Sequence, residues 1–429
     1  MWRLSYRIFR AVSAIQYWME RHFTRAGWLV AGSAVAAGAL GVDTNQTVAY
    51  QIFTLLVALL LVAMAATWLI TASCAVTREL PRMVTAGQPF NYRLRVTNQS
   101  ARPVDGVALL EDIADPRPSF AEFRAHLKLP TYRGWKRLIR RKQIVHVAEG
   151  TLPPLAPHAE VEINVTAETY RRGIAHFEAI TIARADPLGI FRKLSVVREP
   201  ANVLVLPRRY ELPPFHLPGS RRYQPGGVTL ATSVGDSEEF MGLRDYRPGD
   251  PLQRIHWKSF ARAGEPIVKE YQDEFFERHA LVLDTFCGAG DQTSFEEAVS
   301  IAASFACTIN TQECLLDLVF VGAESYCYTA GRGQLQTSNL IEILAGVQPC
   351  ADKSFKLLHD AVLAQRAMLT GCICILLAWD QARQAFVQQL RAVGVPLRAL
   401  VVTSSEIPDK PEWLLLLNPG KIHEGLARL

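Results

Sequence analysis

A long uncharged run near the N-terminus constrains this chain more than any other feature of its sequence. Residues 44–77 contain no charged side chain, and residues 52–62 within them are almost all apolar. A helix needs about 20 mostly apolar residues to cross the hydrocarbon core of a bilayer. The run exceeds that requirement and predicts a transmembrane helix within residues 48–76.

A second uncharged stretch precedes the first, at residues 26–42. Its 17 residues lie near the lower length limit for a span, and they are rich in Gly and Ala, whose small side chains let a neighbouring helix approach closely. A cleaved signal peptide is disfavoured, because the stretch starts late and the second span follows at once. We therefore predict a hairpin of two transmembrane helices over residues 26–77.

The charges around the two stretches predict which side of the membrane the rest of the chain occupies. Basic residues flank the hairpin on both outer sides, whereas Asp43 is the one charged residue between the spans. The flanking residues are Arg3, Arg7, Arg10, Arg21 and Arg25 before the hairpin, and Arg78 and Arg82 after it. Positively charged flanks stay in the cytoplasm. We therefore expect a multi-pass protein of the bacterial inner (plasma) membrane, with residues 78–429 in the cytoplasm.

Composition favours several folded domains whose cysteines are reduced. The 429 residues suffice for two or three domains, and the net charge of +5 is too mild to indicate nucleic-acid binding by itself. None of the eight cysteines forms a CxxC pair. Cys372 and Cys374 lie in an apolar run, so we expect buried thiols rather than disulfides or a metal site.

Residues 78–205 show the two-residue periodicity of half-buried strands. Apolar side chains alternate with polar ones at residues 90–97 and 161–166, and turn signals such as Asp186-Pro187-Leu188-Gly189 separate the runs. Short strands at this spacing predict a β-sandwich of immunoglobulin-like type. The Cys–Trp–Cys pattern of a true immunoglobulin domain is missing from the segment.

A strongly basic insertion interrupts this segment at residues 132–142, where six of eleven residues are Lys or Arg. Beside an anionic inner leaflet each basic residue gains about 1 kcal/mol, so lipid contact is one interpretation. A solvated loop or helix face and a nucleic-acid contact are the other two. The candidate lipid-facing residues are Arg133, Trp135, Lys136, Arg137, Arg140, Arg141 and Lys142.

The most informative stretch is the signature segment, residues 206–278. Acidic and basic side chains interleave there around large aromatic residues, which suits either a rigid brace between domains or a partner-binding patch with buried aromatic anchors. The candidate residues are Glu238, Glu239, Arg244, Tyr246, Gly249, Asp250, Arg254, Trp257, Lys258 and Arg262. His256 lies close to Asp250 in sequence, but no nucleophile accompanies them, so we assign no catalytic residue.

This segment resembles the signature of the bacterial family named domain of unknown function 58. The resemblance rests on Leu243-Arg244-Asp245-Tyr246, Pro248-Gly249-Asp250, Arg254-Ile255-His256-Trp257 and Ala261-Arg262, together with Arg172-Gly173 and residues 186–191 upstream. It implies a C-terminal domain similar to the von Willebrand factor A (vWA) domain. It also implies partnership with MoxR-type AAA+ ATPases.

Strands and helices alternate from residue 279 onward, which predicts an α/β domain around a mostly parallel sheet. The predicted strands are residues 280–284, 315–321, 326–329, 372–378 and 397–402, and the predicted helices are residues 295–309, 339–344, 355–368 and 382–393. The resemblance to vWA domains implies an Asp-x-Ser-x-Ser site for Mg²⁺ after the first strand, where oxygen ligands suit a hard cation. Asp284 fits, but Phe286 and Gly288 occupy the Ser positions, so we favour Asp284 as a strand-end cap. A rearranged site, in which Asp284 is joined by Thr285, Asp291, Thr293 or Ser294, stays open.

The sequence contains no GxxxxGK[ST] phosphate loop, no HExxH and no G-x-S-x-G elbow. We therefore expect a protein-interaction adaptor, not an enzyme, which acts with a MoxR-type AAA+ ATPase in the assembly or maturation of envelope or membrane complexes. A hydrolase-type enzyme that uses the signature segment and a metal-dependent vWA ligand-binding protein are the alternatives. Membrane lipids are expected partners, nucleic acid and cofactors are not, and Mg²⁺ at Asp284 and homo-oligomerisation stay open.

The predicted organisation has five parts. They are a basic cytoplasmic N-terminus at 1–25, two transmembrane helices at 26–77, a β-sandwich-like domain at 78–205, the signature segment or interdomain brace at 206–278, and a vWA-like α/β domain at 279–429.

Overall fold

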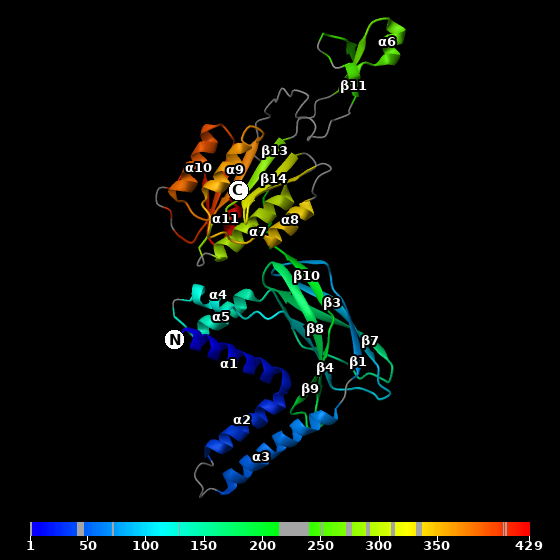
Figure 1. Cartoon of the computed structure of the whole chain (residues 1–429), viewed down its shortest axis with the longest axis vertical. Coiled ribbons are helices and arrows are strands. Elements are labelled where there is room, and N and C mark those ends of the chain that lie inside the picture. Colours follow the sequence, from blue (N-terminus) through cyan, green and yellow to red (C-terminus); the bar gives the residue numbers. More distant parts are fainter. Residues whose placement is uncertain are drawn as a thin grey trace. The chain divides into compact units, whose positions relative to one another are not determined.

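The computed structural model describes most of the chain, and Figure 1 draws its helices and strands. The described residues are 2–40, 47–70, 73–127, 129–213, 240–248, 250, 252–271, 277–288, 292–309, 314–331, 337–405, 407 and 410–429. The chain divides into two compact units, Met1–Arg208 with Glu342–Gly346, and Arg209–Ile341 with Val347–Leu429. It is thus a multidomain protein, and each unit is described by itself.

Three helices open the first unit. They are α1 (Trp2–His22), α2 (Arg25–Leu40) and α3 (Thr47–Ala66), and a 3₁₀ turn, η1 (Thr67–Leu69), follows them. Val48–Leu69 contains an 18-residue window with a mean hydropathy of 2.5 and is the one described helix long and apolar enough to cross a membrane. With 16 residues α2 is too short by this criterion, so the helix lengths do not support two spans. Residues 41–46, which include Asp43, lie outside the described part.

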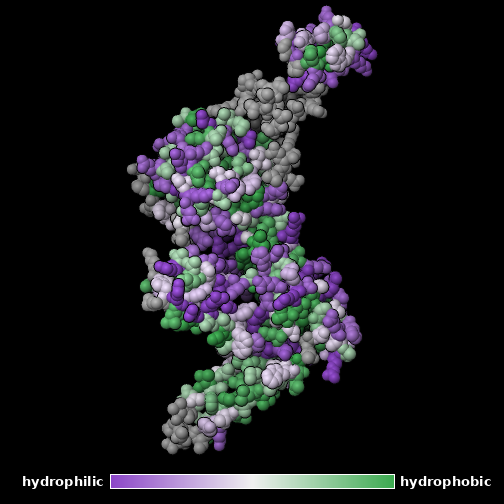
Figure 2. Space-filling model, viewed as in Figure 1, coloured by the Kyte–Doolittle hydropathy of each residue, from purple (hydrophilic) through white to green (hydrophobic). Residues whose placement is uncertain are grey.

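The helices α2 and α3 run side by side as a hairpin (Figure 1). Small residues allow this close approach, as the sequence predicts. A Cβ atom on Gly38 would lie 3.1 Å from the Phe53 ring, and Ala34 and Ala37 are buried on the same helix. Figure 2 shows the surface of this hairpin as largely hydrophobic.

Two facing β-sheets form the body of the first unit. The four-stranded sheet has the order β1-β3-β7-β5, and the six-stranded sheet has the order β2-β10-β8-β4-β6 with β9 paired to β8. All of these pairs are antiparallel except β2 with β10. The strands are β1 (Cys74–Glu79), β2 (Met83–Thr85), β3 (Pro89–Asn98), β4 (Val107–Ile113), β5 (Val145–Val147), β6 (Gly150–Thr151), β7 (Glu160–Thr169), β8 (Gly173–Ala185), β9 (Arg192–Val197) and β10 (Ala201–Leu206).

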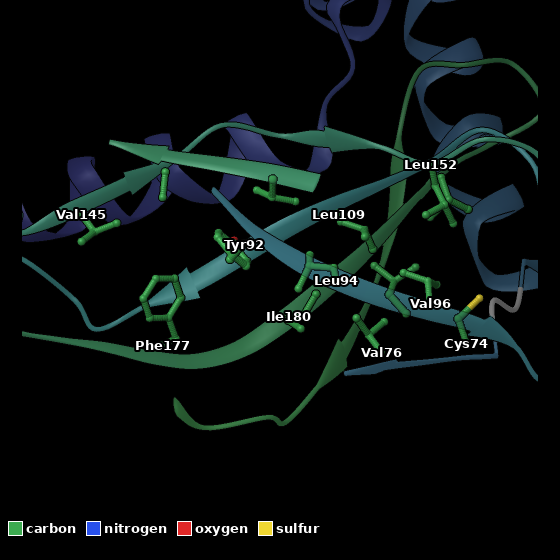
Figure 3. Packing of buried hydrophobic residues seen from close by; sticks show 14 of the residues in the cluster. Cys74, Val76, Tyr92, Leu94, Val96, Leu109, Val145, Leu152, Phe177 and Ile180 are labelled. Carbon is green, nitrogen blue, oxygen red and sulfur yellow. The ribbon is translucent and has the colours of Figure 1, made fainter. Parts of the chain in front are cut away.

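The predicted alternation of residues 90–97 is confirmed. Tyr92, Leu94 and Val96 are buried, and they pack against residues of β8 that include Phe177 and Ile180 (Figure 3). Asn91, Arg93 and Arg95 of the same strand face solvent, because successive side chains of a strand point to opposite sides. The two sheets thereby share one core, as in a sandwich.

The basic insertion folds as a helix. A short helix, α4 (Phe120–His126), precedes it, and α5 (Tyr132–Lys142) carries the basic residues. Ser119 and Glu122 form a capping box at the start of α4, and the Thr131 hydroxyl caps α5 by accepting from the Gly134 N–H. Both helix starts are therefore encoded locally.

The second unit is built on a six-stranded sheet of order β15-β14-β13-β16-β17-β18. All neighbours are parallel except β14 with β15, so the predicted mostly parallel sheet is confirmed. The strands are β13 (Glu277–Leu283), β14 (Cys314–Val321), β15 (Ser325–Ala330), β16 (Gly371–Leu376), β17 (Leu397–Val402) and β18 (Leu414–Leu417). The helices are α7 (Gln292–Thr308), α8 (Thr337–Gly346), α9 (Lys356–Ala364), α10 (Gln381–Ala392) and α11 (Ile422–Leu426).

Helices cover both faces of this sheet, which explains the continuous apolar runs of its central strands. One core cluster joins Val282 of β13 to Leu358 of α9 and Phe386 of α10. The neighbouring residue, Leu283, points to the other face, where α7 packs. Cys372 and Cys374 are buried free thiols in β16, as predicted.

Candidate functional site

The signature segment contains a small hairpin, which we call the signature hairpin, residues 240–271. It consists of β11 (Phe240–Asp245), η2 (Leu252–Arg254), α6 (Trp257–Ala263) and β12 (Ile267–Tyr271), with β11 and β12 paired antiparallel. Its own buried residues in the described part are Ile255 and Val268. A two-stranded hairpin with so little core is marginal in water by itself.

A charged clamp holds the loop of the signature hairpin. The Arg244 guanidinium donates to both carboxylate oxygens of Asp250, at 2.7 and 2.8 Å, and the Arg247 backbone N–H donates to the same carboxylate at 2.8 Å. This two-bond geometry is the strong form of an Arg–carboxylate pair. The bonds from Arg244 hold the pKa of Asp250 down at about 2, against an ordinary 3.8. Asp250 is thus fixed as an anion.

The tryptophan of this hairpin lies on its surface. Trp257 is 63% exposed, and Leu252 and Leu243 are exposed as well. The Trp257 ring meets Phe260 edge to face at 5.9 Å, which sets its orientation on α6. The expectation of a buried aromatic anchor is therefore wrong for Trp257 in the described chain, because the hairpin has no interior large enough to enclose an indole.

The remaining candidates of the signature segment divide into three groups. Arg254, Lys258 and Arg262 are exposed, and Tyr246 is half-buried, with its backbone N–H bonded to the Pro266 carbonyl. Glu238, Glu239 and Gly249 lie outside the described residues. Six basic and three acidic residues between 242 and 269 give this part of the hairpin a positive balance.

The described contacts do not join His256 to Asp250. A ring nitrogen of His256 lies 2.6 Å from the Ser259 hydroxyl, whereas Asp250 is held by Arg244 and Arg247. An acid–base pair acts through direct or water-bridged hydrogen bonds. In the described part of the chain, His256 and Asp250 therefore do not form an acid–base pair with each other.

Asp284 lies at the carboxyl end of β13, next to the point where the sheet order reverses between β13 and β16. Ligands of α/β sheets often bind at such a switch point. Here the chain's own Arg383 fills the position: its Nε donates to Asp284 Oδ2 at 2.6 Å, and its Nη2 donates to the Phe286 carbonyl at 3.0 Å. The Leu377 and Phe286 N–H groups also donate to the Asp284 carboxylate, at 3.0 and 2.9 Å.

These residues do not fit Mg²⁺. Both oxygens of Asp284 are already bonded, its neighbour Arg383 supplies the positive charge, and Phe286 and Gly288 offer no side-chain oxygen. The described residues contain no group of three or more His, Cys, Asp or Glu placed to hold a metal. Asp291 lies outside the described part. Burial raises the pKa of Asp284, and the bond from Arg383 opposes that rise.

The helix α5 presents a basic face to solvent, with one exception to the predicted set. Arg133, Lys136, Arg137, Arg140 and Lys142 are exposed, and Arg141 is partly exposed. Trp135 is fully buried against Phe123 and the aromatic residues of α1. The prediction that Trp135 faces lipid is therefore wrong, because the helix period places it on the apolar side of α5.

The turn at residues 186–191 joins the β domain to the base of α2. The Asp186 carboxylate accepts from the Ile190 and Phe191 N–H groups at 2.6 and 2.9 Å, which fixes the turn. The Thr24 N–H then donates to the Ile190 carbonyl at 3.1 Å. A Cβ atom on Gly27 would lie 2.2 Å from that carbonyl oxygen, so only Gly permits this contact.

Sequence reasoning missed two features of the described chain. Arg383 is 99 positions from Asp284, and its own neighbourhood predicts an ordinary surface helix. The prediction for residues 1–25 is only a basic flank, although Leu4, Ile8 and Ile15 recur at helical spacing among the arginines of α1. That periodicity is a signal from which an amphipathic helix was predictable.

Fold and site together define a multidomain chain with an apolar N-terminal helix, a two-sheet β domain and a mostly parallel α/β domain. Residues 242–405 match the family model described as "Protein of unknown function DUF58". This match covers the described signature hairpin and most of the α/β sheet.

Comparisons with individual proteins give weaker likenesses. "Uncharacterized protein YeaD" of Bacillus subtilis (strain 168) is 24% identical over 176 residues, which are 41% of this chain and 42% of that protein. The chain therefore matches less than half the length of this relative. Among solved structures, the CARDB domain of the PF1109 protein from Pyrococcus furiosus has 13% identity and a TM-score of 0.18, over 31% of this chain and 93% of that one. A Salmonella alpha-2-macroglobulin mutant has 15% identity and a TM-score of 0.20, over 41% of this chain and 9% of that one.

Proposed function

We propose that this protein is a membrane-anchored adaptor whose signature hairpin binds a partner protein. The supporting observation is the exposed indole of Trp257 on α6. Leu252 and Leu243 of the same hairpin are exposed as well, and six basic residues lie between residues 242 and 269. Trp and Arg are the residues most enriched among those that dominate binding energy. Because the hairpin buries so little of its own surface, contact with a partner would supply the missing core.

The proposed partner is a MoxR-type AAA+ ATPase, and the proposed role is the assembly or maturation of envelope or membrane complexes. Support comes from the resemblance of the signature segment to domain of unknown function 58. The positive balance of the hairpin further favours an acidic partner surface. On the same resemblance, we propose a vWA-like α/β domain. We also propose an immunoglobulin-like arrangement of the β domain, which the short alternating strands and the core shared by the two sheets support.

The proposed anchor is the α2–α3 hairpin, in which α3 crosses the bacterial inner membrane and α2, although shorter than a usual span, crosses beside it and returns the chain to the same side. Basic flanks at Arg25 and Arg78 favour both ends on the cytoplasmic side. A reporter fused to the C-terminus should be active in the cytoplasm, and the protein should resist a carbonate wash. Periplasmic reporter activity, or release by carbonate, would refute this anchoring.

Partner binding is tested with the full-length chain, tagged at its C-terminus and purified from native membranes in mild detergent. A MoxR-type ATPase should co-purify, and Trp257→Ala should reduce its recovery roughly 30-fold if the indole contributes about 2 kcal/mol. Lys258→Glu should also reduce the recovery of the ATPase. Lys410→Glu is the matched control, because it makes the same charge change at an exposed site outside the hairpin and should leave the recovery unchanged.

Two results would refute the partner assignment or its site. If no ATPase is enriched over an unrelated membrane protein, the partnership fails. If Trp257→Ala leaves ATPase recovery unchanged while Arg244→Glu unfolds the hairpin, the segment is a brace between domains. Hydrogen exchange of the hairpin peptides separates these cases, since a surface substitution leaves the protection of β11 and β12 intact.

We propose that Asp284 has a structural role, in place of the metal-binding alternative. Its carboxylate accepts from Arg383 and from two backbone N–H groups, so three of its roughly four acceptor positions are taken. Calorimetry with Mg²⁺ and Mn²⁺ on the full-length protein should therefore give no binding heat. Heat that disappears in Asp284→Ala would favour the metal-dependent alternative.

A further inference from the structure

The N-terminal helix α1 has two apolar faces. On one of them Trp2, Tyr6 and Phe9 pack against the α4–α5 pair. The Tyr6 ring lies 5.6 Å from Trp135, and the Trp2 ring lies 5.7 Å from Phe123, both edge to face. This face is therefore already used inside the protein.

The second apolar face of α1 is exposed, and we call it the α1 stripe. Its members are 44–65% exposed: Leu4, Ile8, Val12, Ile15 and Trp18. They are separated by four, four, three and three positions, which places them along one side of a helix. Leu4 and Ile8 each lie two positions from Tyr6, so they point away from the packed face. A contiguous apolar stripe of this kind marks a surface that contacts another apolar phase.

Arginines accompany the α1 stripe. Arg3, Arg7 and Arg10 are exposed beside it, and Glu20 is the one acidic residue of the helix. An apolar stripe with cationic flanks is the composition of helices that lie in the plane of a membrane interface. The arginine stems extend along the apolar surface while their charged heads reach the phosphate level.

The position of α1 next to the membrane helices is fixed by contacts. It ends at His22, and only Phe23 and Thr24 separate it from α2. Figure 1 shows the two helices meeting at an angle. Phe23 in this elbow packs on Phe191 of the β domain with 4.4 Å between ring centroids. Arg21 is paired with Asp112 of β4. The elbow therefore holds α1 beside the base of the apolar hairpin.

We propose that α1 lies on the cytoplasmic surface of the bilayer, with the α1 stripe at the headgroup–acyl boundary and its arginines on acidic phospholipids. This inference rests on the proposed anchoring through α3. It also assigns the lipid contact to α1 instead of α5. The helix α5 turns Trp135 toward α1, so its basic face points away from the helix that touches the bilayer.

Photocrosslinking in the full-length protein tests the proposal. A photoreactive benzoylphenylalanine replaces Ile8, Ile15, Leu55 of α3 or Arg137 of α5, one at a time, and the protein is reconstituted into lipid nanodiscs. Leu55 is an exposed residue of the membrane helix and serves as the positive control. Arg137 is an exposed residue of the basic face and serves as the matched control. Lipid adducts are then identified by mass spectrometry.

The expected result is lipid adducts at Ile8, Ile15 and Leu55, and none at Arg137. Adducts at Ile8 should increase several-fold when phosphatidylglycerol is added to phosphatidylcholine nanodiscs, and Arg3→Gln with Arg7→Gln should abolish that increase. Adducts at Leu55 but not at Ile8, or adducts of Ile8 to a second copy of the chain, would overturn the proposal. Adducts at Arg137 as strong as those at Ile8 would also overturn it. Loss of adducts at Leu55 would instead refute the membrane anchoring.

Discussion

Removing the guanidinium beside Asp284 is the sharpest perturbation that the α/β domain offers. Arg383→Ala deletes the bonds to the Asp284 carboxylate and the Phe286 carbonyl, the ion pair with Asp380 and the contact with the Phe355 ring. It leaves the two backbone N–H donors to Asp284 in place. The Asp284 side chain is fully buried, and Arg383 is 7% exposed. The variant would therefore hold a buried carboxylate without a compensating charge.

The expected destabilisation is large. Breaking a buried ion pair from one side costs about 3–5 kcal/mol, which lowers the ratio of folded to unfolded domain by roughly a hundredfold to four-thousandfold. The loss should depend on pH. Burial raises the pKa of Asp284, and without Arg383 that pKa rises further. The folded variant then binds more protons than the unfolded chain, so its deficit is smallest below about pH 4 and grows as pH rises.

Hydrogen exchange of the full-length protein in detergent measures this effect locally, through peptides that cover β13 and β16. Arg391→Ala is the matched control, because Arg391 is an exposed residue of the same helix whose guanidinium lies 4.5 Å from the centre of the Trp413 ring. Arg391→Ala should lower the free energy of unfolding by less than about 1 kcal/mol. If Arg383→Ala accelerates exchange by less than about fivefold, which is under 1 kcal/mol, Arg383 does not compensate a buried charge.

Two further predictions concern the signature hairpin and the β domain. The pKa of Asp250 is lowered to about 2 by Arg244, so the hairpin should keep its exchange protection above about pH 4 and lose it as pH falls toward 2. Asp250→Asn should remove this acid transition, and a transition that persists in the variant would contradict the clamp. Tyr92→Phe deletes the donor to the buried Glu111 carboxylate and should cost about 1.5–3 kcal/mol in thermal unfolding. Tyr170→Phe deletes the same kind of bond to a carboxylate at an exposed site, and an equal loss there would contradict the role of burial.

Periodicity in the sequence predicts much of this fold, because local patterns report which side of an element is buried. Tyr92, Leu94 and Val96 alternate with polar residues and line the β core as expected. The apolar runs around Val282 and Cys374 likewise give buried parallel strands. In both domains the local sequence pattern alone predicts which residues of a strand are buried.

The features that escaped prediction depend on partners distant in the chain. Trp135 lies among basic residues, yet it is buried because α1 and α4 pack over it. The pairing of Asp284 with Arg383 follows from the sheet order, which no local pattern encodes. Trp257 is the reverse of Trp135. Its neighbours in sequence predict a buried aromatic anchor, but it is exposed because the described hairpin is too small to bury it.

The contact between the 186–191 turn and α2 has a mechanical consequence. Backbone atoms of Thr24 and Ile190 meet directly, and Gly27 removes the side chain that would hold them apart. A contact between backbone atoms, with no long side chain between them, allows little relative movement of the turn and the helix. A force applied to the β domain would therefore reach α2 directly through this backbone contact, and the helix would tilt together with that domain.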